Sequence, residues 1–297
     1  MIQTQQGAVS QSQLNTLVQA YINIQPDKPI YLQYVDYLSA LLHGNLGTSI
    51  WYGEPVVDII LSAVPWTIFI MTISLLLTFG LGTALGAIMA YAEGSRFDVS
   101  ASTLSTFLNS IPFYVVAIVL VYILGYIYGI FPTGGRYDYD TVTPGLSIAF
   151  LGSVLYHAVL PIITMVITGF GGWALSMRGN SIQVLGEDYL RVARLRGLPS
   201  QQIALRYVGR NAVLPMYTSL MISIGFLLGG SVILEQIFQY QGMGFYLFRA
   251  IKTSDYPLMM GGFLIITIAV VVAIFIADLT YGFIDPRAGR GDSNESF

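Results

Sequence analysis

The densest cluster of charge in this chain reads Glu187-Asp188-Tyr189-Leu190-Arg191-Val192-Ala193-Arg194-Leu195-Arg196-Gly197-Leu198, and it continues through Arg206, Arg210 and Asn211 to Leu214-Pro215. It lies between two strongly apolar segments, residues 150–177 and 212–235, each long enough to cross a bilayer as a helix. A charged helical hairpin between two such segments is most simply a docking surface for a soluble partner. We therefore expect this chain to be the membrane part of a larger assembly.

The composition supports a membrane protein. Hydrophobic residues make up 55% of the 297 residues and charged residues only 10%, whereas about a quarter of the residues in a soluble domain are charged. Apolar stretches of membrane-spanning length lie near residues 65–91, 105–131, 150–177, 212–235 and 257–281. The alternation required of a lipid-facing barrel strand is absent. We therefore predict an all-α, polytopic helical membrane protein with five spans.

Positive charge predicts the orientation of these spans, because cytoplasmic loops retain Lys and Arg. If the first span runs from outside to inside, the cytoplasmic side holds Arg96, Arg178, Arg191, Arg194, Arg196, Arg206, Arg210, Arg287 and Arg290, and the outer side holds Lys28, Arg136, Arg249 and Lys252. We therefore expect a multi-pass protein of the plasma or inner membrane. Its N-terminus would lie outside as given, and the loop 178–211 and the tail 282–297 would lie in the cytoplasm.

Residues 1–64 form the predicted extracytoplasmic segment. Residues 1–20 are rich in Gln, Ser and Thr and lack the basic and apolar regions of a signal peptide. Further on, apolar residues recur at helical spacing, namely Tyr31, Tyr34, Val35, Leu38, Leu41 and Leu42. We expect a short amphipathic helix here, resting on membrane lipid.

Several kinds of chemistry are excluded by the residues that the chain lacks. It contains no cysteine, and neither Lys28 nor Lys252 fits the Gly-x-x-x-x-Gly-Lys-Ser/Thr pattern that cradles phosphate. His43 and His157 are too far apart for a zinc-protease motif, and Gly-x-Ser-x-Gly is absent. No basic stripe interleaved with aromatics suggests nucleic acid. We expect a transport subunit that binds no cofactor or metal, rather than an enzyme.

Polar residues inside the spans are few, so each is a candidate for function. Glu235, Asp278 and His157 all lie near span ends, where structural hydrogen bonding is the alternative explanation. We expect a substrate path to be lined by Asn109, Ser176, Ser223, Ser231 and Glu235. Gly82 and Gly86 are spaced for close approach of two helices.

The charged segment has the signals of two helices. Glu187 and Asp188 suit the positive end of a helix dipole, and Gly197 suits the position just after a helix end. Ser200 is suited to cap a second helix over about 200–210. The alternative is a basic amphipathic helix lying on anionic lipid.

The segment from Glu187 to Pro215 resembles the EAA loop of ABC importer permeases, in the form found in the dipeptide/oligopeptide branch. The matching residues are Ala193-Arg194-Leu195-Arg196-Gly197-Leu198 and Arg210-Asn211-Ala212-Val213-Leu214-Pro215. Further matches in colinear order include Leu42-His43-Gly44-Asn45-Leu46-Gly47, Glu235-Gln236-Ile237-Phe238, Gly242-Met243-Gly244, Asp255-Tyr256-Pro257 and Asp285-Pro286-Arg287.

This resemblance implies a type I importer transmembrane domain. Its partners would be a second, homologous permease subunit, two ATPase subunits that bind ATP and Mg, and an extracytoplasmic solute-binding protein. Residues 187–198 would form the coupling helix seated on an ATPase subunit, with Arg210 and Asn211 supporting the hairpin. The chain would then form half of a path that faces out and in alternately.

Two departures from the family pattern narrow this expectation. Arg191-Val192-Ala193 replaces the usual Glu-Ala-Ala, as fits the peptide branch. Relatives of this kind usually have six spans, so an N-terminal helix is expected to be missing, or this is a five-span variant.

The cargo is expected to be a dipeptide or oligopeptide, with oligosaccharide or another small solute as the alternative. The alternative from another class is an ion-coupled carrier or channel that works without an ATPase.

Overall fold

A computed structural model describes residues 28–199, 202–227 and 230–284 of the chain, and these fold as helices with no strand; an isolated bridge pairs Thr48 with Pro55. The α-helices are α2 (Ile30–Leu42), α3 (Val56–Tyr91), α4 (Arg96–Ser110), α5 (Phe113–Leu120), α6 (Ile148–Leu185), α7 (Asp188–Leu195), α9 (Arg210–Gly225), α10 (Val232–Ile237), α11 (Met243–Thr253) and α12 (Tyr256–Ile284). Two π-helices, η2 (Val121–Ile127) and η3 (Ile203–Gly209), complete the described elements. The all-α prediction is confirmed.

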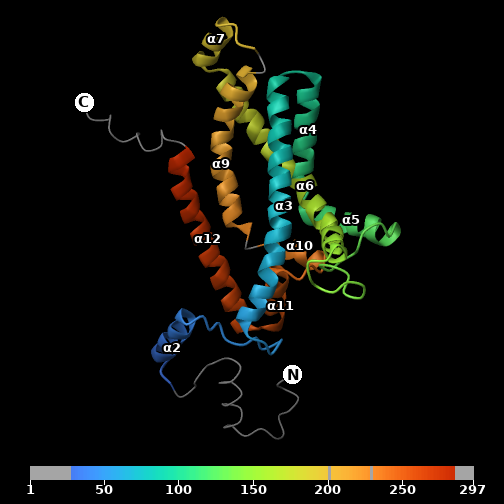
Figure 1. The fold of residues 1–297 in the computed structure, drawn as a ribbon, viewed down its shortest axis with the longest axis vertical. Coiled ribbons are helices and arrows are strands. Elements are labelled where there is room, and N and C mark those ends of the chain that lie inside the picture. Colours follow the sequence, from blue (N-terminus) through green and yellow to red (C-terminus); the bar gives the residue numbers. More distant parts are fainter. Residues whose placement is uncertain (1–27, 200–201, 228–229, 285–297) are drawn as a thin grey trace, which may run out of the picture.

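The long helices form an elongated bundle with two different ends (Figure 1). α3 packs most extensively against α6, which also contacts α4 and α9, and α12 packs against α9. α7 and η3 lie at one end, which we call the hairpin end. α2 and the segment that follows it lie at the opposite end. The two candidate functional regions are therefore separated by the length of the bundle.

Glycines allow the central helices to approach closely. A Cβ on Gly86 of α3 would lie 2.2 Å from the carbonyl oxygen of Ala174 in α6, and one on Gly82 would lie 2.5 Å from Cβ of Trp173. A Cβ on Gly171 of α6 would lie 2.4 Å from the carbonyl oxygen of Ser105 in α4. These contacts confirm the predicted role of Gly82 and Gly86, because any side chain there would force the backbones apart.

Three of the described helices, α3, α6 and residues 256–276 of α12, have the length and composition to cross a bilayer. A fourth crossing would be made by α4 and the α5–η2 segment taken together, although these two meet at 86°. At 1.5 Å per residue the 36 residues of α3 extend for about 54 Å, well beyond the roughly 30 Å of hydrocarbon in a bilayer. α3 and α6 therefore carry their ends out of the apolar layer.

The prediction of one continuous helix over 105–131 is wrong. α4 begins earlier, after Ser95, whose hydroxyl accepts the backbone N–H of Asp98, and it ends at Ser110. Ile111 has extended backbone angles, φ −81° and ψ 123°, and Pro112 follows it. The proline ring disfavours the helical conformation in the residue before it, so the chain turns at this point.

The prediction of one continuous helix over 212–235 is also wrong. α9 ends at Gly225, and α10 starts again only after Ser231, whose hydroxyl accepts the backbone N–H of Leu234. Gly230 between them has a φ of +60°, which is incompatible with a right-handed helix. The short helices α10 and α11 therefore form a folded connection between α9 and α12 (Figure 1).

The predicted N-terminal amphipathic helix is confirmed as α2, whereas the prediction for residues 1–20 lies outside the described residues. None of the residues of α2 is buried. Its exposed apolar side chains include Ile30, Tyr34, Val35 and Leu42. The lipid contact predicted for this helix stays a prediction.

Candidate coupling surface and substrate path

The hairpin formed by α7 and η3 has a small apolar core of its own. Leu190 and Ala193 on one face of α7 are buried against Ile203 and Val208 of η3. Leu198 packs at the edge of the same cluster. The second element is a π-helix over Ile203–Gly209 instead of the ordinary helix predicted near 200–210, and residues 200–201 lie outside the described part.

Gly197 ends α7 as its sequence position predicts. Its φ is +72°, and the backbone N–H of Leu198 donates to the carbonyl oxygen of Ala193 at 3.3 Å. This is the hydrogen bond of a Schellman motif, in which the residue after the glycine also makes an apolar contact with the last turn. At the other end, Asp188 is in the first turn of α7 and the carbonyl oxygen of Glu187 accepts the N–H of Leu190.

The opposite face of α7 is exposed and mixes apolar with basic side chains. Tyr189, Val192 and Leu195 are 41%, 52% and 82% exposed. The basic side chains of Arg191 and Arg196 are exposed beside them, while those of Arg194 and Arg206 lie outside the described residues. A compact surface of this kind suits a protein partner, because apolar groups and Arg are enriched at the centres of interfaces.

Asn211 joins the hairpin to the bundle. Its side-chain Nδ2 donates to the hydroxyl of Tyr189 at 3.0 Å and to the carbonyl oxygen of Tyr207 at 2.8 Å. The first contact connects α9 to α7, and the second connects α9 to η3. Arg210 is exposed. The structure thus places Asn211 in the supporting position expected for it.

An ion pair beneath the hairpin was not predicted from the sequence. Asp98, 1% exposed at the start of α4, accepts from Nε of Arg178 at 2.5 Å and from Nη2 of Arg178 at 2.7 Å. The backbone N–H of Gly94 also donates to Asp98 at 3.0 Å. Because Arg178 belongs to the part of α6 that leads to the hairpin, this pair joins α4 to α6. An isolated Asp far from Arg178 in sequence gives no signal for such pairing.

The residues predicted to line a substrate path do not form one hydrogen-bonded cluster. Asn109 of α4 faces Gly172 of α6, and both Asn109 and Ser176 are exposed. Ser223 is partly exposed and donates to the carbonyl oxygen of Ser219 in its own helix. Ser231 caps α10. Their role in transport stays a prediction.

The ionisable candidates have structural hydrogen bonds where their side chains are described. Glu235 is fully buried and accepts from the Thr67 hydroxyl and the Phe245 backbone N–H. Nδ1 of His157 lies 2.8 Å from the carbonyl oxygen of Ser153. The side chain of Asp278 lies outside the described residues.

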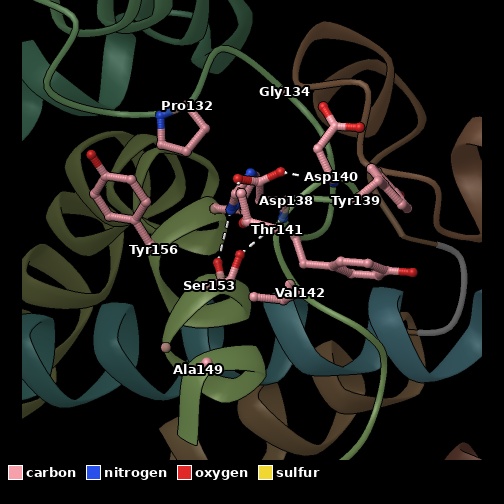
Figure 2. Close-up of a pocket in the computed structure, with 13 residues that line it drawn as sticks. Pro132, Gly134, Asp138, Tyr139, Asp140, Thr141, Val142, Ala149, Ser153 and Tyr156 are labelled. Atoms are coloured by element: carbon pink, nitrogen blue, oxygen red, sulfur yellow. Dashed lines mark hydrogen bonds between the residues drawn. The ribbon is translucent and has the colours of Figure 1, made fainter. Parts of the chain in front are cut away.

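A pocket of about 790 Å³ opens between residues 132–142 and one face of α6 (Figure 2). Figure 2 shows Ser153 of α6 directed toward the loop, where its hydroxyl accepts the backbone N–H of Asp138 at 2.9 Å. The Thr141 hydroxyl donates to Asp138 at 2.6 Å, and this bond lowers the pKa of the Asp138 carboxyl below its usual value of 3.8. Tyr137 and Tyr139 stack at 4.3 Å between ring centroids.

A bundle with a self-contained polar hairpin at one end defines a helical membrane transport subunit that works with a soluble partner. The chain matches the family described as "Binding-protein-dependent transport system inner membrane component" over residues 82–290. Because this match covers well over half of the chain, the protein belongs to that family and is a permease subunit of the inner membrane.

Relatives support the same assignment. The chain is 34% identical over 280 residues to the probable D,D-dipeptide transport system permease protein DdpB of Escherichia coli, covering 89% of this chain and 82% of the relative. It is 32% identical over 274 residues to the di/tripeptide permease DppB of Pseudomonas aeruginosa, covering 88% and 81%. It is 32% identical over 260 residues to the oligopeptide permease AppB of Bacillus subtilis, covering 87% and 80%.

A solved structure has the same fold. The inward-facing MetNI methionine ABC transporter matches with a TM-score of 0.60 and 14% identity, over 76% of this chain and 96% of the other. At this identity the likeness supports the fold of a type I importer subunit.

Proposed function

We propose that this permease forms half of the membrane path of an ATP-driven importer of peptides, and that α7 couples the path to an ATPase subunit. The observation that carries this proposal is the exposed face of Tyr189, Val192 and Leu195 on a helix whose other face is locked to η3. A partner that moves α7 moves η3 and α9 with it, because Asn211 joins all three.

The full assembly would contain a second, homologous permease, two ATPase subunits that bind ATP and Mg, and an extracytoplasmic binding protein. The hairpin end then faces the cytoplasm, which agrees with the six Arg residues of the loop 178–211. ATP, bound by the partners, shifts the permease between two states by its different affinity for them.

Peptide cargo is supported by the printed functions of the relatives, which are permeases for D,D-dipeptides, di- and tripeptides, and oligopeptides. Oligosaccharide uptake is the outcome that would redirect the assignment of cargo without changing the machinery.

The test is uptake of a labelled dipeptide into proteoliposomes that hold both permeases, the two ATPases and the loaded binding protein. We expect uptake only with ATP and all subunits present. Uptake that continues without the ATPases would identify an ion-coupled carrier or channel instead.

A matched pair of variants tests the docking face. Leu195→Asp introduces a charge at the proposed interface, whereas Leu42→Asp changes a similarly exposed leucine, 88% exposed, at the opposite end of the bundle. We expect Leu195→Asp to reduce copurification of the ATPase about tenfold or more, the effect of losing an interface contact of 1.4 kcal/mol. Leu42→Asp should leave it unchanged, and equal copurification with both variants would reject α7 as the contact.

A further inference from the structure

Glu235 is a completely buried carboxylate whose described partners are all neutral. On α10, its Oε1 accepts from the hydroxyl of Thr67 at 2.9 Å and its Oε2 accepts from the backbone N–H of Phe245 at 2.9 Å. No described Lys or Arg side chain forms an ion pair with it. A buried carboxylate is costly unless hydrogen bonds replace water, so these donors must stay in place while the charge is buried.

The donors belong to two other helices. Thr67 lies in the first third of α3 and is also fully buried, and its hydroxyl oxygen accepts the backbone N–H of Met243 at 2.7 Å. Met243 and Phe245 are the first and third residues of α11, whose cap residue Gly242 has no side chain to satisfy them. Thr67 and Glu235 therefore do the work of an N-cap from outside the helix, and the helix dipole favours a negative charge at this end.

Three glycines enclose the carboxylate. A Cβ on Gly242 would lie 2.3 Å from the Thr67 hydroxyl oxygen, and one on Gly230 would lie 2.7 Å from Oε1 of Glu235. A Cβ on Gly244 would lie 2.8 Å from Cα of Val232. The site therefore brings the backbones of α10 and α11 directly against the side chains of Glu235 and Thr67, with no room for a further methyl group.

The far end of α11 is held by a second buried carboxylate. Asp255, between α11 and α12, accepts from the Ser49 hydroxyl at 2.5 Å and from the backbone N–H of Trp51 at 3.1 Å. It also accepts the N–H of Leu258 in the first turn of α12. α11 is therefore fixed at its start to α3 and at its end to the segment before α3, and it can leave α3 only if these bonds break.

We propose that Glu235 is a positioning residue of the transport cycle: with Thr67 it latches the start of α11 to α3 and holds α10 and α11 across the outer end of the path. This inference rests on the proposed function. Opening the latch exposes the carboxylate to water, which replaces its neutral donors, so opening leaves no buried cation without a partner. The latch is therefore a contact that can be broken and remade in each cycle.

The test uses the full complex in vesicles and an introduced Met243→Cys as a reporter. Met243 is 1% exposed and the chain has no other cysteine, so a membrane-impermeant maleimide labels this position only when the start of α11 opens to the outside. The latch variants are Glu235→Gln and Thr67→Val, and the conservative control is Thr67→Ser, which keeps the hydroxyl. ATPase activity is measured with and without the loaded binding protein.

Per mole of assembled complex, we expect each latch variant to be labelled about fivefold faster, the effect of losing one net hydrogen bond. ATPase activity without the binding protein should rise similarly, and Thr67→Ser should behave as the wild type. A purely structural role would lower the amount of assembled complex without changing these two rates. If Thr67→Val does not assemble, Glu235→Gln alone decides the outcome.

Wild-type rates for the assembled latch variants would overturn the proposal. A wild-type complex that lacks binding-protein-dependent uptake would instead reject the proposed function, so the two failures are distinguishable.

Discussion

The two ends of this permease hold a buried carboxylate in different ways. At the hairpin end, Asp98 accepts two hydrogen bonds from the guanidinium of Arg178, and at the opposite end Glu235 accepts from a hydroxyl and a backbone N–H. Separating the first pair would leave two charges without partners, whereas opening the second leaves one carboxylate that water can solvate. We therefore expect α4 and α6 to move as one body near the hairpin, and α11 to separate from α3 at the other end.

The largest expected effect comes from removing the charge at each end in turn. Asp98→Asn leaves the Arg178 cation without its partner and should lower the melting temperature of the detergent-solubilised protein by roughly 5 °C or more. Glu235→Gln leaves no unpaired charge and should change it less, although it alters the labelling rate described above. Arg178→Gln combined with Asp98→Asn should recover part of the loss, and equal melting temperatures for both single variants would remove the contrast.

Gly86→Ala tests the close packing that joins the two ends. The new Cβ would lie 2.2 Å from the Ala174 carbonyl oxygen, so α3 and α6 must separate, at an expected cost of about 1–3 kcal/mol in the free energy of unfolding. The matched control is Gly80→Ala in the same helix, where no atom lies within 4 Å of the new Cβ. Gly80→Ala should be neutral or stabilising by about 0.5–1 kcal/mol, because alanine favours the helix. Chemical unfolding of both variants measures the difference.

Gly197→Ala makes a smaller change, confined to the hairpin. Its φ of +72° is strained for alanine, which should cost about 1–2 kcal/mol locally and fray the end of α7. Gly186→Ala is the control, because Gly186 has a helical backbone, φ −77° and ψ −11°. Copurification of the ATPase should fall for Gly197→Ala alone, and a fall with both variants would argue against an effect of backbone strain.

The smallest effect is expected from pH at the outer pocket. The folded-state pKa of Asp138 is lowered, mainly by the Thr141 hydroxyl, so its contribution is present above the usual value of 3.8 and is lost as pH falls through the lowered pKa. Trp66 stacks near Tyr137 at 5.9 Å and reports on this loop by fluorescence. We expect an acid transition below pH 3.8 that Asp138→Asn removes. Asp140→Asn, on the same loop, should keep it.

Much of the hairpin could be predicted from local sequence signals. Gly197 ends α7 and the apolar spacing of residues 31–42 gives α2, because a cap and a helical period depend only on neighbours in the chain. The breaks at Pro112 and Gly230 carried signals too, but uniform hydropathy concealed them, and two spans were predicted as continuous.

The partners of the buried carboxylates could not be predicted in this way. Glu235 was expected near a substrate path, and its site depends on Thr67 and Phe245, which are 168 and 10 residues away. Asp98 was not singled out, because Arg178 lies 80 residues further on.

The sequence by itself determined the membrane setting, the helical class and the charged hairpin, since hydropathy, charge and caps act over a few residues. Only the tertiary structure decided which helices meet through glycine, how α10 and α11 fold between α9 and α12, and which donors surround Glu235. Those features depend on contacts between residues far apart in the chain, whose geometry exists only after the helices have packed.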